Sequence, residues 1–285
     1  MKNKVLSLIL VYSLYIIAFI AAYFSSRFIK DNIYLELFFM DVIATVIIWI
    51  FSIVIKNTSL YDPYWSLTPW ALASYLFIIN KVNNPYTLIL YLVFSIWSWR
   101  LTINWMITFE DLKWEDWRYK GYREKLPRPL FEILNLVGFQ MMPTVLVYAG
   151  LIPLLVILNH DASAFSIFGS VVILLGILLE LFADHEMHTF LSTTKEKKVC
   201  QVGLWKYSRH PNYLGENLIW LGLYIALVVS LPEYWYLCIG FIAIFLLFEF
   251  VSIPLMEKRQ KERRSDYFDY IKSTPRMVPF TKFKK

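Results

Sequence analysis

The chain alternates long apolar runs with short polar segments. About 20 apolar residues cross the hydrocarbon core of a bilayer, and shorter runs do so with tilt or with polar ends. The pattern therefore predicts an all-α, polytopic membrane helix bundle that forms a single domain over residues 1–285. The third and the seventh run are short, so seven or eight spans fit the pattern, and we predict eight. The predicted spans are Val5–Phe24, Leu37–Ile55, Ser66–Ile79, Tyr86–Thr108, Leu136–Leu158, Ser163–Ala183, Asn217–Leu231 and Tyr234–Pro254.

The distribution of positive charge predicts the orientation. With the N-terminus inside, 24 of the 28 Lys and Arg residues fall on the cytoplasmic side, so both termini are predicted to be cytoplasmic. The exceptions are Arg27, Lys30 and Lys81 outside and Arg100 within a span. A net charge of +6 thus reflects topology, and we predict no nucleic-acid partner.

Composition supports an integral membrane protein, because 58% of the residues are hydrophobic and only 18% are charged. A soluble chain usually carries about 25% charged residues. No cleavable targeting signal is evident, which fits a bacterial inner membrane or a eukaryotic endomembrane. The pattern does not indicate any particular oligomeric state.

Arg100 lies inside a predicted span, where an ionised side chain costs at least about 2.5 kcal/mol. Asn104 follows one helical turn later, so both side chains share a helix face. Two roles for Arg100 are compatible with this position. It either pairs with Glu180 or Asp41 to hold helices together, or it belongs to a functional site.

Asp62 opens the third predicted span and is directly followed by Pro63. One interpretation is a helix N-cap with proline at the first helical position. The other is a functional acid beside Tyr64. Farther along, Asp184, His185 and His188 are reminiscent of metal ligands, but the HExxH spacing is missing and no cysteine is near. We therefore predict no metal site.

The segment from Arg209 to Glu216 reads Arg-His-Pro-Asn-Tyr-Leu-Gly-Glu and is more polar than packing requires. Pro211 is expected to start a helix whose first N–H groups face the cytoplasm. Such a helix start, flanked by Arg209 and His210, suits phosphate groups. Asn212 and Glu216 stand four residues apart, so both can hydrogen-bond the amide or ribose of a nucleotide cofactor. A merely interfacial helix start would need only one basic residue and a cap.

This segment closely resembles the C-terminal signature of the steroid 5α-reductase-like superfamily, and more specifically its branch of unknown function called DUF1295. The resemblance covers residues 62–280, which is most of the chain. Its other matching pieces are Asp62–Ser66, Arg100–Asn104, Glu115–Tyr119 with Arg123, Ala183-Asp184, and the tail Tyr267–Tyr270 leading to Pro279.

The resemblance implies a membrane-embedded, NADPH-dependent reductase that transfers a hydride to an activated C=C bond of a steroid or other lipid. Its partners would be membrane lipid and a lipophilic small-molecule substrate. The family's catalytic pair is a Glu and a Tyr, for which Asp62 is the nearest acid here, whereas Trp97 stands where the tyrosine is expected. A 3-oxosteroid substrate therefore does not follow from the resemblance.

The predicted catalytic residues are Asp62, Tyr64 and Arg100, of which Tyr64 or a protonated Asp62 would serve the substrate carbonyl. The cofactor phosphates are expected to meet a set of basic residues, namely Lys195, Lys197, Lys198, Arg209, Arg263 and Arg264. The predicted contacts to NADPH are Asp184, Tyr207, Arg209, His210, Asn212, Tyr213 and Glu216.

Two other function classes compete. Membrane methyltransferases of the isoprenylcysteine or phospholipid type, which use S-adenosylmethionine, share an Arg-His-Pro-x-Tyr-x-Gly motif. Asn212 together with Glu216 and the long N-terminal half favour the reductase. A non-catalytic lipid-binding protein or small transporter would explain the charges within spans but not the cluster around Arg209, and paired inverted halves are not evident.

Overall fold

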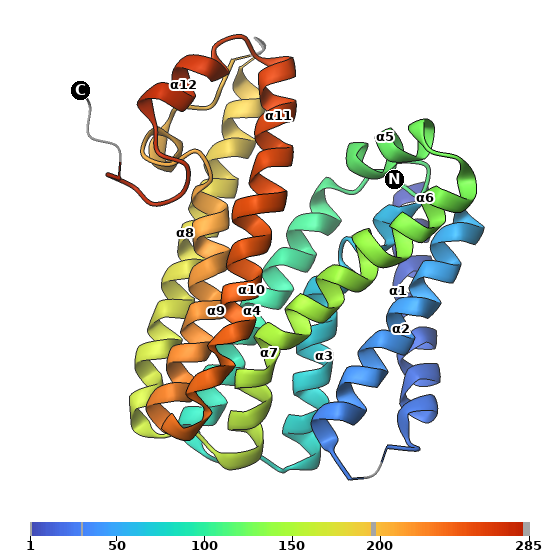
Figure 1. The fold of residues 1–285 in the computed structure, drawn as a ribbon, viewed down its shortest axis with the longest axis vertical. Helices are drawn as coiled ribbons and strands as arrows, with labels where there is room; N and C mark the ends of the chain where they lie inside the picture. The colour runs from blue at the N-terminus through green and yellow to red at the C-terminus, as the bar shows by residue number, and fades with distance from the viewer. Residues whose placement is uncertain (1, 30, 195–197, 282–285) are drawn as a thin grey trace. The chain divides into compact units, whose positions relative to one another are not determined.

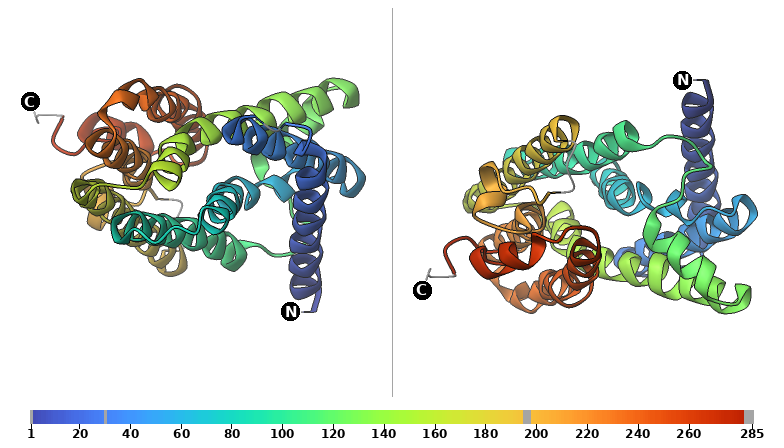
Figure 2. Two further views of the ribbon diagram at one scale, coloured as in Figure 1. Left: turned by 90° about the horizontal axis from the view of Figure 1, so that it is seen from below. Right: turned by 90° about the horizontal axis from the view of Figure 1, so that it is seen from above.

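The computed structural model describes residues 2–29, 31–194 and 198–281, and it is helical apart from turns and connecting loops (Figure 1). No strand occurs among these residues, as the two further views in Figure 2 also show. The predicted all-α class is confirmed.

Seven helical segments of the described chain are long and apolar enough to cross a membrane. They contain seven of the predicted spans to within one residue at their ends. The remaining predicted span, Ser66–Ile79, does form helix α3 (Tyr64–Ile79), but its 16 residues are fewer than a bilayer crossing usually requires. The multi-pass bundle is thus confirmed, whereas the cytoplasmic position of the termini stays a prediction. The seven segments are Asn3–Ser26, Ile33–Ile55, Pro85–Thr108, Arg128–His160, Ala164–Thr193, Pro211–Ser230 and Pro232–Arg263.

The contacts of the chain divide it into two compact units. Unit 1 comprises Met1–Val82 and Phe94–His160, and unit 2 comprises Asn83–Val93 and Asp161–Lys285. Helix α4 (Pro85–Thr108) begins in unit 2 and ends in unit 1. The single domain over residues 1–285 stays a prediction.

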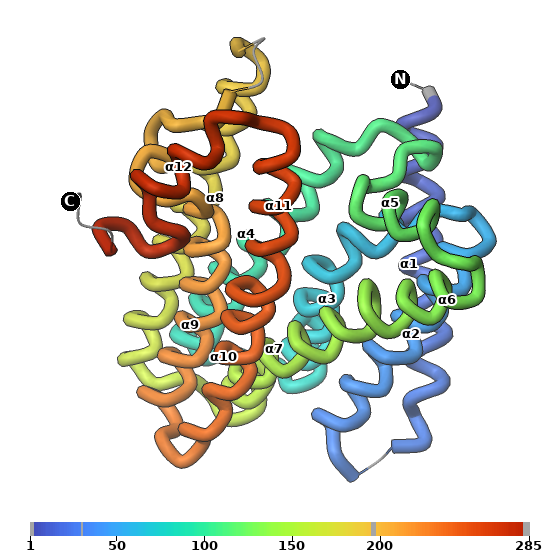
Figure 3. The backbone as a smooth tube through the Cα atoms, turned by 45° about the horizontal axis from the view of Figure 1, so that its top comes forward, coloured from blue at the N-terminus to red at the C-terminus, as the bar shows by residue number. Residues whose placement is uncertain are grey.

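In unit 1, α1 packs along α2, and both α2 and α3 pack along α7. Side-chain caps set two of the helix starts, because Asn32 accepts the N–H of Leu35 and Asp116 accepts the N–H of Arg118. Figure 3 shows α6 continuing into α7, and a π-helical turn, η2, joins them. The bounds are α1 Lys2–Ser26, α2 Ile33–Ile55, η1 Thr58–Tyr61, α5 Trp117–Lys125, α6 Arg128–Leu134, η2 Asn135–Met141 and α7 Met142–His160.

In unit 2, α8 and α9 pack against each other along much of their length, and they run in opposite directions. A second π-helical turn, η6, joins α10 to α11. The short α12 and the loop after α8 lie at one end of this unit, where the candidate site is found. The bounds are η3 Ala164–Ser166, α8 Ile167–Thr193, η4 Gly203–Lys206, α9 Pro211–Ser230, η5 Pro232–Leu237, α10 Cys238–Leu247, η6 Phe248–Ser252, α11 Ile253–Arg263 and α12 Tyr267–Ser273.

Candidate functional site

Helices α8 and α9 approach so closely that glycines are required between them. A Cβ atom at Gly215 would lie 2.5 Å from Cγ of Glu180 and 2.7 Å from the carbonyl oxygen of Gly176. Two turns farther along, a Cβ atom at Gly222 would lie 2.7 Å from the carbonyl oxygen of Gly169. Small residues allow such backbone contact between membrane helices. Packing therefore explains the glycine of the Arg-His-Pro-Asn-Tyr-Leu-Gly-Glu segment and fixes the start of α9 against α8.

The predicted helix start is confirmed. Helix α9 begins at Pro211, and His210 takes the N-cap position with a non-helical backbone. The His210 carbonyl accepts the N–H of Leu214 at 3.1 Å, which closes the first turn. This backbone hydrogen bond therefore fixes His210 and Pro211 at the start of α9.

The loop before α9 is tied to α8 by two hydrogen bonds. The indole N–H of Trp205 donates to the carbonyl of Ala183 at 2.9 Å, and the N–H of Leu204 donates to the Glu186 carboxylate at 2.8 Å. Gly203 has φ +52, and a Cβ atom there would lie 1.8 Å from Glu186. Only glycine fits this close turn without rearrangement. The loop thus has one fixed course over the end of α8.

Arg209 connects the start of α9 with the C-terminal segment. Its Nε lies 2.9 Å and its Nη2 2.8 Å from one carboxylate oxygen of Glu257 on α11. Its Nη1 donates to the carbonyls of Thr274 at 2.6 Å and Ile271 at 3.2 Å, and its backbone N–H donates to Pro275. The guanidinium is buried within these contacts. In the structure Arg209 therefore holds the site together, and its contact with a phosphate stays a prediction.

His210 shares the same carboxylate, with its Nε2 3.3 Å from Glu257. Burial lowers the pKa of His210, the charges of Arg209 and Arg276 act in the same direction, and Glu257 opposes them. The imidazole is therefore favoured in its neutral form near pH 7. It can offer one donor and one acceptor to its surroundings.

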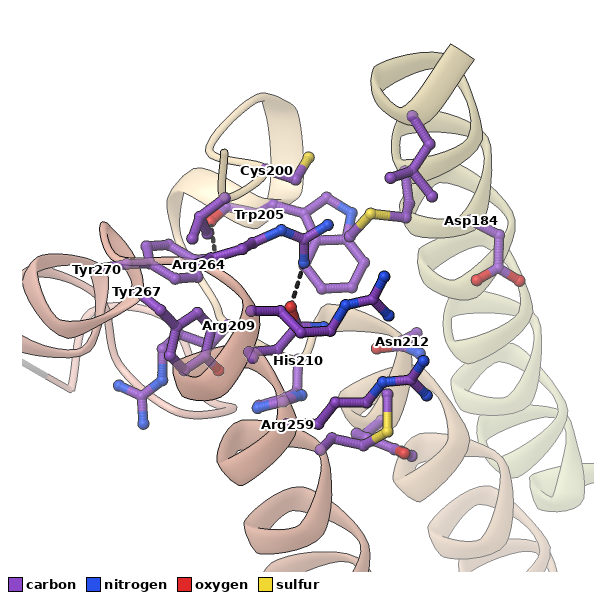
Figure 4. A pocket seen from close by; sticks show the side chains of 17 residues that line it. Asp184, Cys200, Trp205, Arg209, His210, Asn212, Arg259, Arg264, Tyr267 and Tyr270 are labelled. Carbon is purple, nitrogen blue, oxygen red and sulfur yellow. Dashed lines mark hydrogen bonds between the residues drawn. The ribbon is translucent and has the colours of Figure 1, made fainter. Parts of the chain in front are cut away.

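These elements surround a cavity of about 500 Å³ (Figure 4). Its size falls within the range of about 300–1,000 Å³ that is common for small-molecule sites. Five of the residues predicted to bind the cofactor line it together: Asp184, Arg209, His210, Asn212 and Tyr213. The other lining residues are Met187, Leu191, Val199, Cys200, Trp205, Met256, Arg259, Gln260, Arg263, Arg264, Tyr267 and Tyr270.

Two residues predicted to bind the cofactor are not in the cavity lining. Glu216 is buried one turn below Asn212, and its carboxylate accepts the indole N–H of Trp220 at 2.9 Å. Tyr207 is 47% exposed, and its ring lies 5.9 Å from that of Phe280. A role for either residue in cofactor binding stays a prediction.

One face of α11 supplies four residues to the cavity lining, and of these only Arg263 was predicted from the sequence. Met256, Arg259, Gln260 and Arg263 follow the spacing of a single helix face. Arg264, directly after the helix, also lines the cavity, and burial together with the charge of Arg263 lowers its pKa. Cations gathered in this way repel one another, so a bound anion would relieve their repulsion. The helical spacing of these residues was the available signal.

Asn212 supplies an acceptor that the protein leaves unused. Its side-chain oxygen is inaccessible to water and has no hydrogen-bond partner among the residues that the structure describes. Buried polar atoms are nearly always hydrogen-bonded, so an orphaned atom in a cavity lining fits the donor of a ligand. Figure 4 shows Asp184 on the neighbouring α8, apart from the cluster of Arg209 and His210. A ligand with both anionic groups and N–H or O–H donors therefore fits this cavity.

Only some of the basic residues expected beside the phosphates line the cavity. Arg263 and Arg264 line the cavity, and Lys198 is exposed and outside its lining. Lys195 and Lys197 lie outside the described residues.

The predicted catalytic residues lie in unit 1 and have separate surroundings. The Asp62 carboxylate accepts the hydroxyl of Tyr119 at 2.7 Å and lies 3.6 Å from Arg118. Burial raises the pKa of Asp62 to about 6, although Arg118 opposes this. Pro63, and not Asp62, is the N-cap of α3, so the capping interpretation of Asp62 is wrong.

Tyr64 is buried and donates to Asp41 on α2 at 3.0 Å. Its hydroxyl also lies 3.4 Å from that of Thr45. Arg100 is partly buried on α4, and Asn104 follows it by one turn as predicted. Asp62 and Tyr64 are thus hydrogen-bonded to different partners, and catalytic roles for all three residues stay predictions.

Residues 48–274 match the family described as "Protein of unknown function (DUF1295)". The chain is also similar to the uncharacterized protein C594.04c of Schizosaccharomyces pombe, with 23% identity over 229 residues that cover 71% of this chain and 67% of the relative. No solved structure shows significant similarity. The family match includes the cavity of unit 2 up to Tyr270 and covers most of the chain. The chain therefore belongs to the DUF1295 family.

Proposed function

We propose that this protein is a membrane-embedded reductase that binds NADPH in the cavity of unit 2 and reduces an activated C=C bond of a lipid. The observation that carries the proposal is the composition of this cavity. Arg259, Arg263 and Arg264 gather there with Asp184 and with the unsatisfied side-chain oxygen of Asn212. We also place the chain, as part of this proposal, in the steroid 5α-reductase-like superfamily.

The charge of the cavity favours a dinucleotide over S-adenosylmethionine. The latter carries a cationic sulfonium and no phosphate, whereas NADPH carries several phosphate charges. Guanidinium groups bind phosphates with paired, charge-assisted hydrogen bonds. Three arginines on or next to one helix therefore support NADPH and weaken the methyltransferase alternative. A purely lipid-binding role gives no reason for the combination of these arginines with Asp184 and the unsatisfied oxygen of Asn212.

Each group of the cofactor has a counterpart in the lining. The arginines of α11 would hold the phosphates, Asp184 would accept ribose hydroxyls, and Asn212 would accept the N–H of the carboxamide. Trp205 and Tyr213 offer flat apolar surfaces for the rings. NADPH held in this way would supply the hydride that the β-carbon receives, and a proton would be added at the α-carbon. Asp62, Tyr64 and Arg100 remain the candidates that serve the substrate carbonyl.

The proposal is tested by NADPH consumption with enone lipids in purified, reconstituted protein. The product should gain two hydrogen atoms, which mass spectrometry detects. Asn212→Ala should reduce turnover strongly, and Lys258→Gln, on a part of α11 outside the cavity lining, should not. Turnover that is the same in Asn212→Ala as in the wild type, or methyl transfer from S-adenosylmethionine, would overturn the proposal.

A further inference from the structure

Unit 1 contains a second cavity, of about 290 Å³, at the ends of two membrane-spanning segments. Lys56 directly follows the last residue of Ile33–Ile55, and Arg128 is the first residue of Arg128–His160. Because both spans end here, the cavity lies at the depth of the lipid headgroups. Its lining consists of Ile53, Lys56, Arg123, Leu126, Arg128, Phe131 and Glu132.

One cation of this cavity is fixed by the protein itself. The Arg123 guanidinium lies 2.8 Å from Glu115 and 3.5 Å from Glu132, and it covers the ring of Phe131 at 4.2 Å. Glu132 in turn accepts the side-chain N–H of Asn135 at 3.0 Å. These contacts give the cavity a rigid wall in which one guanidinium lies between two carboxylates, and of these two only Glu132 lines the cavity.

The other two cations of the cavity differ from Arg123. Lys56 and Arg128 are both exposed, and neither forms an ion pair with any residue in the described part of the chain. The cavity therefore presents two cations without an ion-pair partner beside its rigid wall, and cations outnumber carboxylates in its lining. Basic pockets at the ends of membrane helices are suited to anionic headgroups.

Large apolar side chains adjoin the same residues in sequence. Val54 is 71% exposed, Leu130 51% and Ile133 61%. On a span that ends at the headgroups, exposed side chains of this kind meet acyl chains. A soluble anion would use the cations alone, whereas a phospholipid uses both the cations and this apolar surface.

We propose that the cavity binds the phosphate headgroup of an anionic phospholipid. Lys56 and Arg128 contact the phosphate, and the acyl chains lie along the neighbouring apolar surface. The lining of this cavity shares no residue with that of the cavity in unit 2, so the proposal does not depend on the proposed reductase activity.

The site is tested with the full-length protein in detergent, by native mass spectrometry of bound phosphatidylglycerol against phosphatidylcholine. Each basic residue near an anionic headgroup contributes a factor of about five to affinity, so Lys56→Gln/Arg128→Gln should bind phosphatidylglycerol roughly 30-fold more weakly. The matched control is Lys113→Gln/Lys120→Gln, which removes the same charge from exposed positions outside the cavity lining. Non-specific attraction would weaken binding equally in both variants, and that result would overturn the proposal.

Two further experiments distinguish a loss of lipid binding from a loss of folding, and a lipid headgroup from a soluble anion. Lys56 has φ +58, a conformation that glycine adopts more readily, so Lys56→Gly should keep the melting temperature while it weakens lipid binding. Millimolar inorganic phosphate should not displace phosphatidylglycerol. Displacement by phosphate alone would identify a site for a soluble anion and would contradict the lipid assignment.

Discussion

The Nε and Nη2 atoms of Arg209 lie 2.9 and 2.8 Å from a single carboxylate oxygen of Glu257, and both side chains are almost completely buried. The pair connects Arg209, just before α9, with Glu257 on α11, and the two residues are 48 positions apart in sequence. The pair therefore ties the loop before α9 to α11, beside the hydrogen bonds that Arg209 donates to the Thr274 and Ile271 carbonyls.

Removal of one partner should be strongly destabilising. Glu257→Ala leaves the Arg209 guanidinium buried without its counter-charge, which should lower the free energy of unfolding by about 3–5 kcal/mol. The control is Glu249→Ala, because the pair of Glu249 and Arg276 is 25% and 40% exposed and should contribute about 0–1 kcal/mol. Unfolding in detergent measures both variants. Equal losses would show that the buried pair has no special role.

The same cluster should make folding stability depend on pH. The pKa of His210 is lowered from its ordinary 6.5, so the unfolded chain takes up a proton at a higher pH than the folded chain does. Stability should therefore be fully present above about pH 6.5 and decline as the pH falls below it. We expect a larger loss in melting temperature between pH 7.5 and about 5.5 for the wild type than for His210→Gln. An identical pH dependence in the two proteins would contradict the neutral His210.

Gly215 should be sensitive to a single methyl group. In Gly215→Ala the new Cβ atom would meet Glu180 and the Gly176 backbone at 2.5 and 2.7 Å, so α8 and α9 must move apart. Overpacking of this kind costs about 1–3 kcal/mol. At Gly121 on α5 nothing lies within 4 Å, so Gly121→Ala should be neutral or stabilising by up to about 1 kcal/mol. If Gly215→Ala unfolds at the same denaturant concentration as the wild type, the two helices pack less closely than described.

The spans could be predicted from sequence because bilayer thickness sets the length of an apolar run. The third and the seventh run were the uncertain ones. The structure has a candidate span, Pro211–Ser230, at the seventh run, whereas α3 has only 16 residues and carries Ser66, Thr68 and Pro69. The start of α9 could also be predicted, because proline is favoured at the first position of a helix and disfavoured in its interior. The division into two units could not be predicted from any short stretch of the sequence, because it arises from contacts between segments that are distant in sequence.

The candidate site was predictable in part, because Asp184, Arg263 and Arg264 were expected there as well as residues of one continuous segment. The Arg-His-Pro-Asn-Tyr-Leu-Gly-Glu segment led to Asn212, which lines the cavity and whose side-chain oxygen has no hydrogen-bond partner among the described residues. The partners of Arg209 could not be predicted, because Glu257 and the carbonyls of Ile271 and Thr274 approach it only in the folded chain. Glu216 has the correct spacing to follow Asn212, but the second turn of α9 is covered by packing and Glu216 is paired with Trp220.

Asp62 gives a test of the proton donor. If it protonates the substrate, turnover should fall about tenfold per pH unit above its pKa of about 6, because only the neutral acid can donate. Tyr119 donates a hydrogen bond that favours the ionised carboxylate, so Tyr119→Phe should shift this decline to higher pH. Asp62→Asn should abolish turnover in pH-rate measurements. An unchanged profile in either variant would assign the proton donor elsewhere.

Equilibrium binding of NADPH to the purified protein, measured by titration calorimetry, tests the central claim most directly. Charge-assisted hydrogen bonds contribute about 1.5–3 kcal/mol each, so Arg259→Gln/Arg263→Gln should weaken binding by roughly 100-fold or more. Lys258→Gln/Lys261→Gln removes the same charge from the same helix at positions outside the cavity lining and should bind NADPH nearly as the wild type does. Equal affinity in all three proteins, or tight binding of S-adenosylmethionine without binding of NADPH, would contradict a dinucleotide site in unit 2.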